Sequence, residues 1–205
     1  MKKLLIATRS KGKFPEIVRL LEGLPLEFLN LNDTDLPDGY EVEEPAFTFE
    51  GNAIIKAMTL GKKTGFLSLA EDAGLEVDAL GGRPGVYSAR YAPGTDEDRY
   101  NKLLGELSGV PEEKRTARFR TVAAIYDPET DKIRTCEGVY EGVIAEKPVG
   151  SNGFGFDPVF YNKELDKTSA EMSVDEKNSV SHRGKALRAA REILEKEFLS
   201  HGTEK

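Results

Sequence analysis

Short apolar runs alternate with segments of helical periodicity in the first part of the chain. Lys3 to Ala7 predict a buried strand. After Lys13, apolar residues recur at helical spacing, at Ile17, Leu20, Leu21 and Leu24. A second apolar run, Leu26 to Leu31, predicts another strand. The chain therefore opens with a strand, a polar turn, an amphipathic helix and a second strand.

The next segment predicts a loop, a helix and a third strand. Residues 32–46 are acidic and contain proline and glycine, so we expect a surface loop that is long enough to have a function. Thr48 to Thr64 carry small and apolar residues on one helical face, with Asn52 and Lys56 one turn apart. A compact strand over residues 66–70 then leads into an acidic pair, which we expect at the strand's C-terminal end.

The second half predicts one more helix, a strand pair and a final helix. Residues 96–107 have helical spacing, and two strand-like stretches, 117–126 and 133–145, flank a segment rich in Asp and Pro that suits an antiparallel hairpin. Residues 150–158 form a glycine and aromatic loop. Ser181 opens the last helix, whose inward positions are Leu187, Ala190, Leu194 and Phe198.

This order of elements predicts an α/β fold with a mixed twisted sheet flanked by helices. The chain has 205 residues, and we expect a single two-lobed domain over residues 1–199, with a substrate cleft between the lobes, and an exposed tail over 200–205. Because open α/β sheets bind ligands beyond the carboxyl ends of their strands, the polar turn, the acidic pair and the glycine loop are the places to look for chemistry.

Composition and charge exclude several classes of partner and location. The formal net charge is −7, from 29 Lys and Arg against 36 Asp and Glu, which argues against binding to nucleic acid or to an anionic membrane. Cys136 is the single cysteine and cannot form an internal disulfide, so we expect a cytoplasmic protein. The apolar run near Met1 ends at Thr8, short of an export segment, and no run is long enough to span a bilayer.

The polar turn after the first strand is a candidate phosphate site. It combines backbone N–H groups at a helix start with two hydroxyls and three cations, in the residues Thr8, Arg9, Ser10, Lys11, Gly12 and Lys13. The spacing differs from that of a Walker loop, so P-loop chemistry does not follow. The alternative is a solvated basic turn.

The acidic pair Glu71–Asp72 is a candidate metal or general-base site. Both side chains reach one cleft only if the strand ends there, which the following Gly74 permits. Two such carboxylates can hold Mg²⁺, and one without a metal can serve as a general base toward water. Taken alone, a strand end whose charges face solvent is the commoner use of such residues.

Two further segments could recognise a base. In the loop Gly150 to Pro158, the glycines allow close approach of the backbone, and Phe154 or Phe156 offers a flat face for stacking. Lys177 and the helix start at Ser181 to Lys185 could donate hydrogen bonds to the carbonyl oxygens of a base. The alternatives are a glycine hairpin with core phenylalanines and an ordinary helix cap with solvated basic neighbours.

Together, a phosphate cradle, a metal-capable acid pair, a stacking loop and a donor cluster are what a nucleoside triphosphate hydrolase requires. The sequence resembles the inosine/xanthosine triphosphate pyrophosphatases over nearly its whole length. The resemblance rests on Ala7-Thr8 with Lys13 and Glu16, Thr48 to Ala53 with Lys56-Ala57, Glu71 to Leu75, Leu80 to Gly82 with Pro84 to Tyr91, Gly153 to Pro158, and Ser181 to Gly184.

The resemblance implies an activity and a set of residue roles. The expected reaction is hydrolysis of ITP, dITP or XTP to the monophosphate and pyrophosphate, with Mg²⁺ as cofactor and a homodimer as the assembly. It implies that Asp72 is the general base and a metal ligand, and that Glu44, adjacent to Glu43, is a second acidic ligand. The implied triphosphate contacts are Thr8 to Lys13 with Lys56, and the implied base-recognition residues are Phe154, Gly155, Phe156, Asp157, Lys177, His182 and Arg183.

The sequence departs from the family pattern at three places. Ser10 stands where the family usually has Asn, Pro45-Ala46 where it has Thr-Gly, and Ala73 where it has Ser. Ala73 removes a hydroxyl near the phosphates, so only its backbone N–H can contribute there. The alternatives to the expected function are a pyrophosphatase for modified pyrimidine triphosphates and a nucleotide sensor that has lost catalysis.

Overall fold

The computed structural model describes residues 1–10 and 12–199, so Lys11 and the predicted tail over 200–205 lie outside the described residues. The chain forms two compact units. Of the described residues, unit 1 comprises those within 1–72, 122–137 and 186–199, and unit 2 comprises 73–121 and 138–185. Each unit has its own apolar core.

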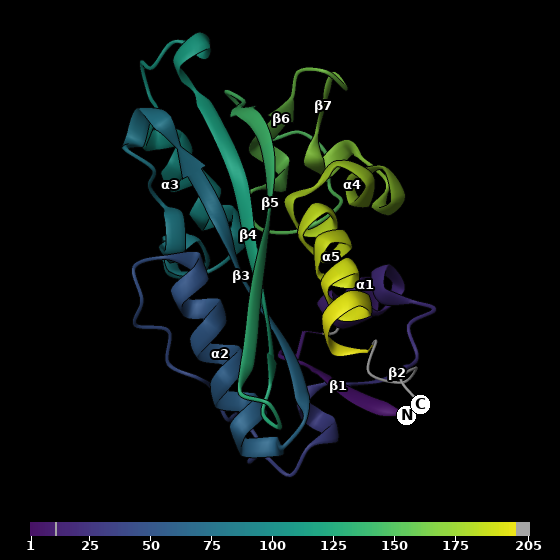
Figure 1. The fold of residues 1–205 in the computed structure, drawn as a ribbon. Coiled ribbons are helices and arrows are strands. Elements are labelled where there is room, and N and C mark those ends of the chain that lie inside the picture. The colour runs from purple at the N-terminus through teal and green to yellow at the C-terminus, as the bar shows by residue number, and fades with distance from the viewer. Residues whose placement is uncertain (11, 200–205) are drawn as a thin grey trace. The chain divides into compact units, whose positions relative to one another are not determined.

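One mixed sheet of seven strands runs in the order β2-β1-β3-β4-β5-β6-β7. β1 pairs in parallel with β2 and β3, whereas β6 pairs antiparallel with β5 and β7. The mixed sheet predicted from the sequence is therefore confirmed (Figure 1). The strands are β1 (Lys2–Ile6), β2 (Leu26–Leu29), β3 (Leu67–Val77), β4 (Thr116–Asp127), β5 (Lys132–Ile144), β6 (Phe160–Asn162) and β7 (Lys167–Thr168).

Helices cover both faces of the sheet in unit 1, where Figure 1 shows α2 (Phe49–Thr64) on one side and α1 (Lys13–Leu21) with α5 (His182–Ile193) on the other. Alternation along β1 explains this arrangement, because successive side chains of a strand point to opposite faces. Leu4 and Ile6 belong to the core that contains residues of α1 and α5. Leu5, between them, packs instead with Leu60 of α2. The predicted α/β class with flanking helices is thus confirmed.

Local signals determine both ends of α2. The Thr48 hydroxyl accepts a hydrogen bond from the N–H of Gly51 at 3.1 Å and caps the first turn. Gly65 ends the helix with φ of 73° and donates its N–H to the Gly61 carbonyl at 2.8 Å. The sequence prediction for this helix is therefore confirmed, and α2 presents Asn52 and Lys56 from a rigid element.

Two strand predictions are wrong at their ends. β3 does not stop at Ala70 but continues through the acidic pair to Val77, with β4 beside it in the sheet. β2 ends at Leu29, two residues earlier than predicted, because a 3₁₀ turn begins at Leu31. The side-chain oxygen Oδ1 of Asn30 caps this turn by accepting a hydrogen bond from the N–H of Asn32 at 2.7 Å. Glu71 and Asp72 therefore lie within a strand rather than after one.

Unit 2 packs α3 (Asp96–Glu106) on its part of the sheet. Leu103 of α3 is fully buried in the same core as Leu75 of β3 and Ala117 of β4. β4 and β5 are neighbours joined by four turn residues, as expected of a hairpin. The sequence did not predict β6, β7 or α4 (Val174–Val180), which are too short to show a periodic pattern.

The last helix begins one residue after Ser181, close to its predicted start, and a π turn over Leu194–Phe198 follows it. Within the described ranges, none of the helices combines the length and apolar character that crossing a bilayer requires.

Candidate active site

The turn between β1 and α1 uses its hydroxyls to shape its own backbone. Thr8 Oγ1 accepts from the N–H of Ser10 at 3.1 Å, and Ser10 Oγ accepts from the N–H of Lys13 at 3.3 Å. Gly12, at the helix start, has no side-chain capping bond. These contacts hold the start of α1 in a defined form, and Lys11 of the predicted phosphate set lies outside the described residues.

Arg9 of the same turn points to the acidic loop. Its guanidinium donates to Asn32 Oδ1 at 2.6 Å and to the Pro37 carbonyl at 3.1 Å. In this geometry Arg9 anchors the loop to the turn. The structure thus assigns the Arg9 side chain a contact that sequence spacing did not predict.

Asp72 lies against two residues of α2. Asn52, which is fully buried, donates from Nδ2 to Asp72 Oδ2 at 3.1 Å and accepts at Oδ1 from the N–H of Ala46 at 2.9 Å. Lys56, one turn later, lies 2.8 Å from Glu44 Oε1 and 3.6 Å from Asp72 Oδ1. The predicted residues Asp72, Glu44 and Lys56 therefore come together in unit 1.

Asn52 is a site residue that the sequence reasoning did not select. It holds the carboxylate of Asp72 with one end of its amide and the end of the acidic loop, at Ala46, with the other. Its spacing of four residues from Lys56 on a helix was the available signal. A buried amide with both ends bonded fixes the orientation of its partners.

Glu71 has different surroundings from Asp72. Its Oε1 lies 3.6 Å from Lys13 Nζ, at the start of α1. Because β3 continues through both residues, their side chains leave the strand toward opposite faces. Lys56 pairs with both Glu44 and Asp72.

The donor set around Asp72 fits a hard divalent cation. One ammonium group contacts both Glu44 and Asp72, so the two carboxylates already face a common positive charge. Mg²⁺ is usually held by one or two carboxylates together with waters and substrate phosphates, not by an all-protein cage. The described part of the chain contains no group of three or more His, Cys, Asp or Glu side chains arranged for a metal, so the predicted trio of Asp72, Glu44 and Glu71 does not form such a group.

The glycine loop presents one of its two phenylalanines. Phe154 is 51% exposed, whereas Phe156 is 4% exposed and packs in the core of unit 2 with an edge contact to Tyr91. Between the two candidates for base stacking, the structure therefore leaves Phe154 as the available ring. Phe156 anchors the loop.

Charged residues surround the ring of Phe154. The Lys177 ammonium lies 4.9 Å and the Arg183 guanidinium carbon 5.6 Å from the ring centroid. Asp157, which is almost fully buried, accepts from the N–H of Phe154 at 2.8 Å and lies 2.5 Å from Lys177 Nζ. The predicted residues Phe154, Asp157, Lys177 and Arg183 thus form one cluster in unit 2, reinforced by cation–π attraction.

Four further residues of the predicted segments lie in defined local surroundings. His182 is 8% exposed, and its ring stacks on Phe119 at 4.8 Å between centroids. Ser181 accepts from the N–H of Gly184 at 3.1 Å and caps α5. Ala73 lies half-buried within β3. Gly155 has φ of 64°, a backbone conformation that favours glycine.

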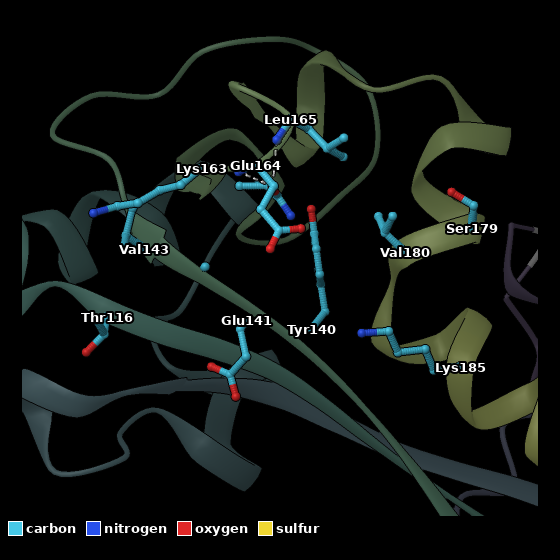
Figure 2. A pocket seen from close by; sticks show the side chains of 12 residues that line it. Thr116, Tyr140, Glu141, Val143, Lys163, Glu164, Leu165, Ser179, Val180 and Lys185 are labelled. Carbon is cyan, nitrogen blue, oxygen red and sulfur yellow. Dashed lines mark hydrogen bonds between the residues drawn. The ribbon is translucent and has the colours of Figure 1, made fainter.

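Two hollows open in unit 2. One of about 310 Å³ is lined by Phe154 and Gly155 together with residues of the first turn of α3. The other, of about 660 Å³, lies among β5, the β6–β7 segment and the α4–α5 junction, and Figure 2 shows Tyr140, Lys185 and Glu141 along its walls. Lys185, from the predicted donor segment at the start of the last helix, lines the larger hollow, and none of the other described site candidates does. This hollow mixes two lysines with two glutamates, so its charge selects no ion.

In this α/β protein, unit 1 holds a carboxylate against an amide and an ammonium group. Unit 2 presents an exposed aromatic ring flanked by cations. Residues 4–193 match the model of the Ham1 family, and the chain belongs to that family. It is 49% identical over 199 residues to a dITP/XTP pyrophosphatase of Desulforamulus reducens, covering 96% of this chain and 98% of that protein. A dITP/XTP pyrophosphatase of Bacillus subtilis is 46% identical over 197 residues, covering 95% and 98%.

Solved structures agree with the fold. A Ham1 protein from Coxiella burnetii is 40% identical, with a TM-score of 0.88 over 95% of this chain and 99% of that one. A structure named nucleoside-triphosphatase / dITP/XTP pyrophosphatase, from Mycobacterium abscessus, is 42% identical, with a TM-score of 0.75 over 92% and 97%.

Proposed function

We propose that this protein hydrolyses deaminated purine nucleoside triphosphates, ITP, dITP and XTP, to the monophosphate and pyrophosphate. The observation that carries the proposal is the position of Asp72, held by Asn52 and facing Lys56 and Glu44. The names of the relatives with nearly full-length similarity support the same reaction.

In the proposed reaction, water attacks the α-phosphorus and the bond from that phosphorus to the α,β-bridging oxygen breaks. Asp72 orients the water and accepts its proton on a carboxylate oxygen. Asn52 holds that carboxylate in one orientation. The ammonium groups of Lys56 and Lys13, with the backbone N–H of Gly12 at the start of α1, stabilise the negative charge of the departing pyrophosphate.

We propose Mg²⁺ as the cofactor, with Glu44 and Asp72 as its ligands. Bound Mg²⁺ supplies positive charge that reduces repulsion between the phosphates and the nucleophile. Lys56 lies between these two carboxylates in the free protein, so binding of the cation requires this ammonium to turn toward the phosphates. Glu71 remains a prediction as a third ligand, and its pairing with Lys13 does not favour it.

The base is proposed to bind on Phe154. Stacking on an aromatic ring contributes about 1 to 3 kcal/mol per base. Inosine and xanthine carry an oxygen at C6 where adenine carries an amino group, so donors such as Arg183 and Lys177 are left unpaired against ATP. His182 completes the donor set in the proposal.

An assay of pyrophosphate release over a panel of triphosphates tests the function. With Mg²⁺, we expect ITP, dITP and XTP to be hydrolysed with kcat/KM at least about 100-fold above that for ATP, a ratio that unpaired polar groups readily supply. Preference for dUTP or another pyrimidine triphosphate would establish the alternative pyrophosphatase. Tight nucleotide binding without turnover would establish a sensor. Loss of turnover with EDTA and its recovery with Mg²⁺ tests the cofactor.

We further propose a cytoplasmic homodimer whose partner is a small-molecule triphosphate, with neither nucleic acid nor membrane as a ligand. The net charge of −7 and the lone Cys136 support this. Light scattering coupled to size-exclusion chromatography measures the mass: twice 22.6 kDa supports the dimer and a single chain mass contradicts it.

A further inference from the structure

The first turn of α3 is hydrogen-bonded to the glycine loop of unit 2. Oδ2 of Asp96 accepts from the N–H of Gly155 at 2.7 Å, although the two residues are 59 positions apart. The other oxygen of Asp96 forms an ion pair with Arg99, one turn later on the same helix. Asp96 therefore links a helix to the residue that follows Phe154.

Two consecutive backbone N–H groups, those of Phe154 and Gly155, donate hydrogen bonds that hold this part of the loop. The N–H of Phe154 donates to Asp157 at 2.8 Å, and the next N–H, of Gly155, donates to Asp96. The ring of Phe154 is half exposed. Because Gly153 and Gly155 both have positive φ, 78° and 64°, this backbone loses more entropy on ordering than an ordinary loop. The hydrogen bonds to the two carboxylates help to offset this cost.

The carboxylate of Asp96 stays ionised at neutral pH. Burial raises the pKa of this group, but hydrogen bonds from Arg99 and from the Gly155 N–H together lower it below its usual value. A charged acceptor makes a stronger hydrogen bond to a backbone N–H than a neutral one. The contact is therefore suited to hold a loop in one conformation.

We propose that Asp96 is a positioning residue that orients Phe154 for stacking on the purine. This inference rests on the proposed function, because it assigns Phe154 to the base. Asp96 acts through the loop, so removing it is expected to weaken binding of the nucleotide while leaving the chemistry at Asp72 unchanged. The neighbouring hollow of about 310 Å³, lined by Asp96, Phe154 and Gly155, is where the loop would move if released.

The kinetic test compares three variants with ITP as substrate. Asp96→Ala removes the acceptor, and we expect KM to rise about tenfold with kcat within about twofold of wild type, since a loss of uniform binding appears in KM. Asp96→Asn keeps an oxygen that can accept from Gly155, and we expect it to restore most of the affinity. Unchanged KM in Asp96→Ala, or no recovery in Asp96→Asn, overturns the proposal.

Asp98→Ala is the matched control, because Asp98 caps the same helix without touching the loop. Its Oδ2 accepts from the N–H of Thr95 at 2.7 Å. We expect this variant to lower thermal stability as much as Asp96→Ala does, without the change in KM. An equal rise of KM in both variants would mean that the loss of affinity comes from a weakened α3 and not from the lost contact with Gly155. That result would overturn the inference.

A fluorescence experiment separates this proposal from the proposed function. The chain contains no tryptophan, so Phe154→Trp introduces a single reporter on the loop. Adding Asp96→Ala is expected to lower its time-resolved anisotropy on the nanosecond scale, and adding Asp98→Ala is not. This result stands even if ITP is not a substrate, whereas equal anisotropy in both double variants contradicts the positioning role.

Discussion

The ammonium group of Lys56 lies 3.6 Å from Oδ1 of Asp72 and 2.8 Å from Oε1 of Glu44. One ammonium group of α2 thus pairs with two carboxylates, one from the acidic loop and one from β3. Lys56 is 14% exposed at its side chain, so these charges are screened less than surface charges are. A substrate phosphate would compete with the two carboxylates for Lys56, and a metal ion would compete with Lys56 for the two carboxylates.

Lys56→Met removes the positive charge and keeps an unbranched side chain. We expect KM for ITP to rise about tenfold or more, the scale of a lost charge-assisted hydrogen bond. In the absence of nucleotide, we expect Mn²⁺, detected by electron paramagnetic resonance, to bind more tightly, because no ammonium competes for the carboxylates. Lys63→Met, on the exposed face of the same helix, is the control. Unchanged KM and Mn²⁺ affinity in Lys56→Met would contradict this reading of the ion pairs.

Asp72→Asn tests the general base. The amide has nearly the same shape but cannot take a proton from water, so we expect kcat to fall about 100-fold or more. Nucleotide affinity, measured by calorimetry with a product monophosphate, should change little. Asp38→Asn, on the exposed loop, controls for loss of charge alone. A fully active Asp72→Asn enzyme would remove this residue from the mechanism.

Arg183→Ala tests recognition of the 6-oxo group. Arg183 is 3% exposed beside the ring of Phe154, so we expect KM to rise more for ITP than for ATP, because only ITP accepts a hydrogen bond at C6. Steady-state kinetics with both nucleotides provide the comparison. Thermal melting of the variant shows how much of the change is structural, with Arg188→Ala, exposed on the same helix, as control. An equal change for both substrates would refute the proposed specificity.

The cap of α4 predicts a dependence of stability on pH. The N–H of Ser173 and the ammonium of Lys167 lower the pKa of Glu176 from 4.5 to about 2. Because the folded pKa lies below the unfolded one, the contribution of Glu176 is present above about pH 4.5 and is lost as pH falls toward 2. The stability difference between wild type and Glu176→Gln, from urea midpoints, should therefore shrink between pH 6 and about pH 2.5.

Asp175→Asn, at the preceding position of the same helix turn, is the control for the loss of an acidic side chain. The capping contacts with Ser173 belong to Glu176, so Asp175→Asn is expected to leave them intact. A constant gap between wild type and Glu176→Gln over the whole range would contradict the prediction.

The local sequence pattern predicted those elements whose cap, periodic face and terminating residue all lie within one continuous stretch. Helix α2 has its cap at Thr48, its periodic face and its terminating Gly65 in one stretch, and the structure agrees with the sequence. The short elements β6, β7 and α4 lack such signals, and their formation depends on neighbours in the fold. The same division applies to the site. Spacing on α2 indicated that Asn52 and Lys56 share a face, but not which carboxylates they meet.

The sequence by itself determined the α/β class, the candidate residues and the family, because periodicity and motif spacing are properties of consecutive residues. Only the tertiary structure decided that β3 continues past Glu71 and Asp72, that Arg9 turns to Asn32, and that Phe154 rather than Phe156 remains exposed. Each of these outcomes depends on a partner distant along the chain. Such partners are selected by packing and hydrogen bonding in three dimensions, which no local pattern contains.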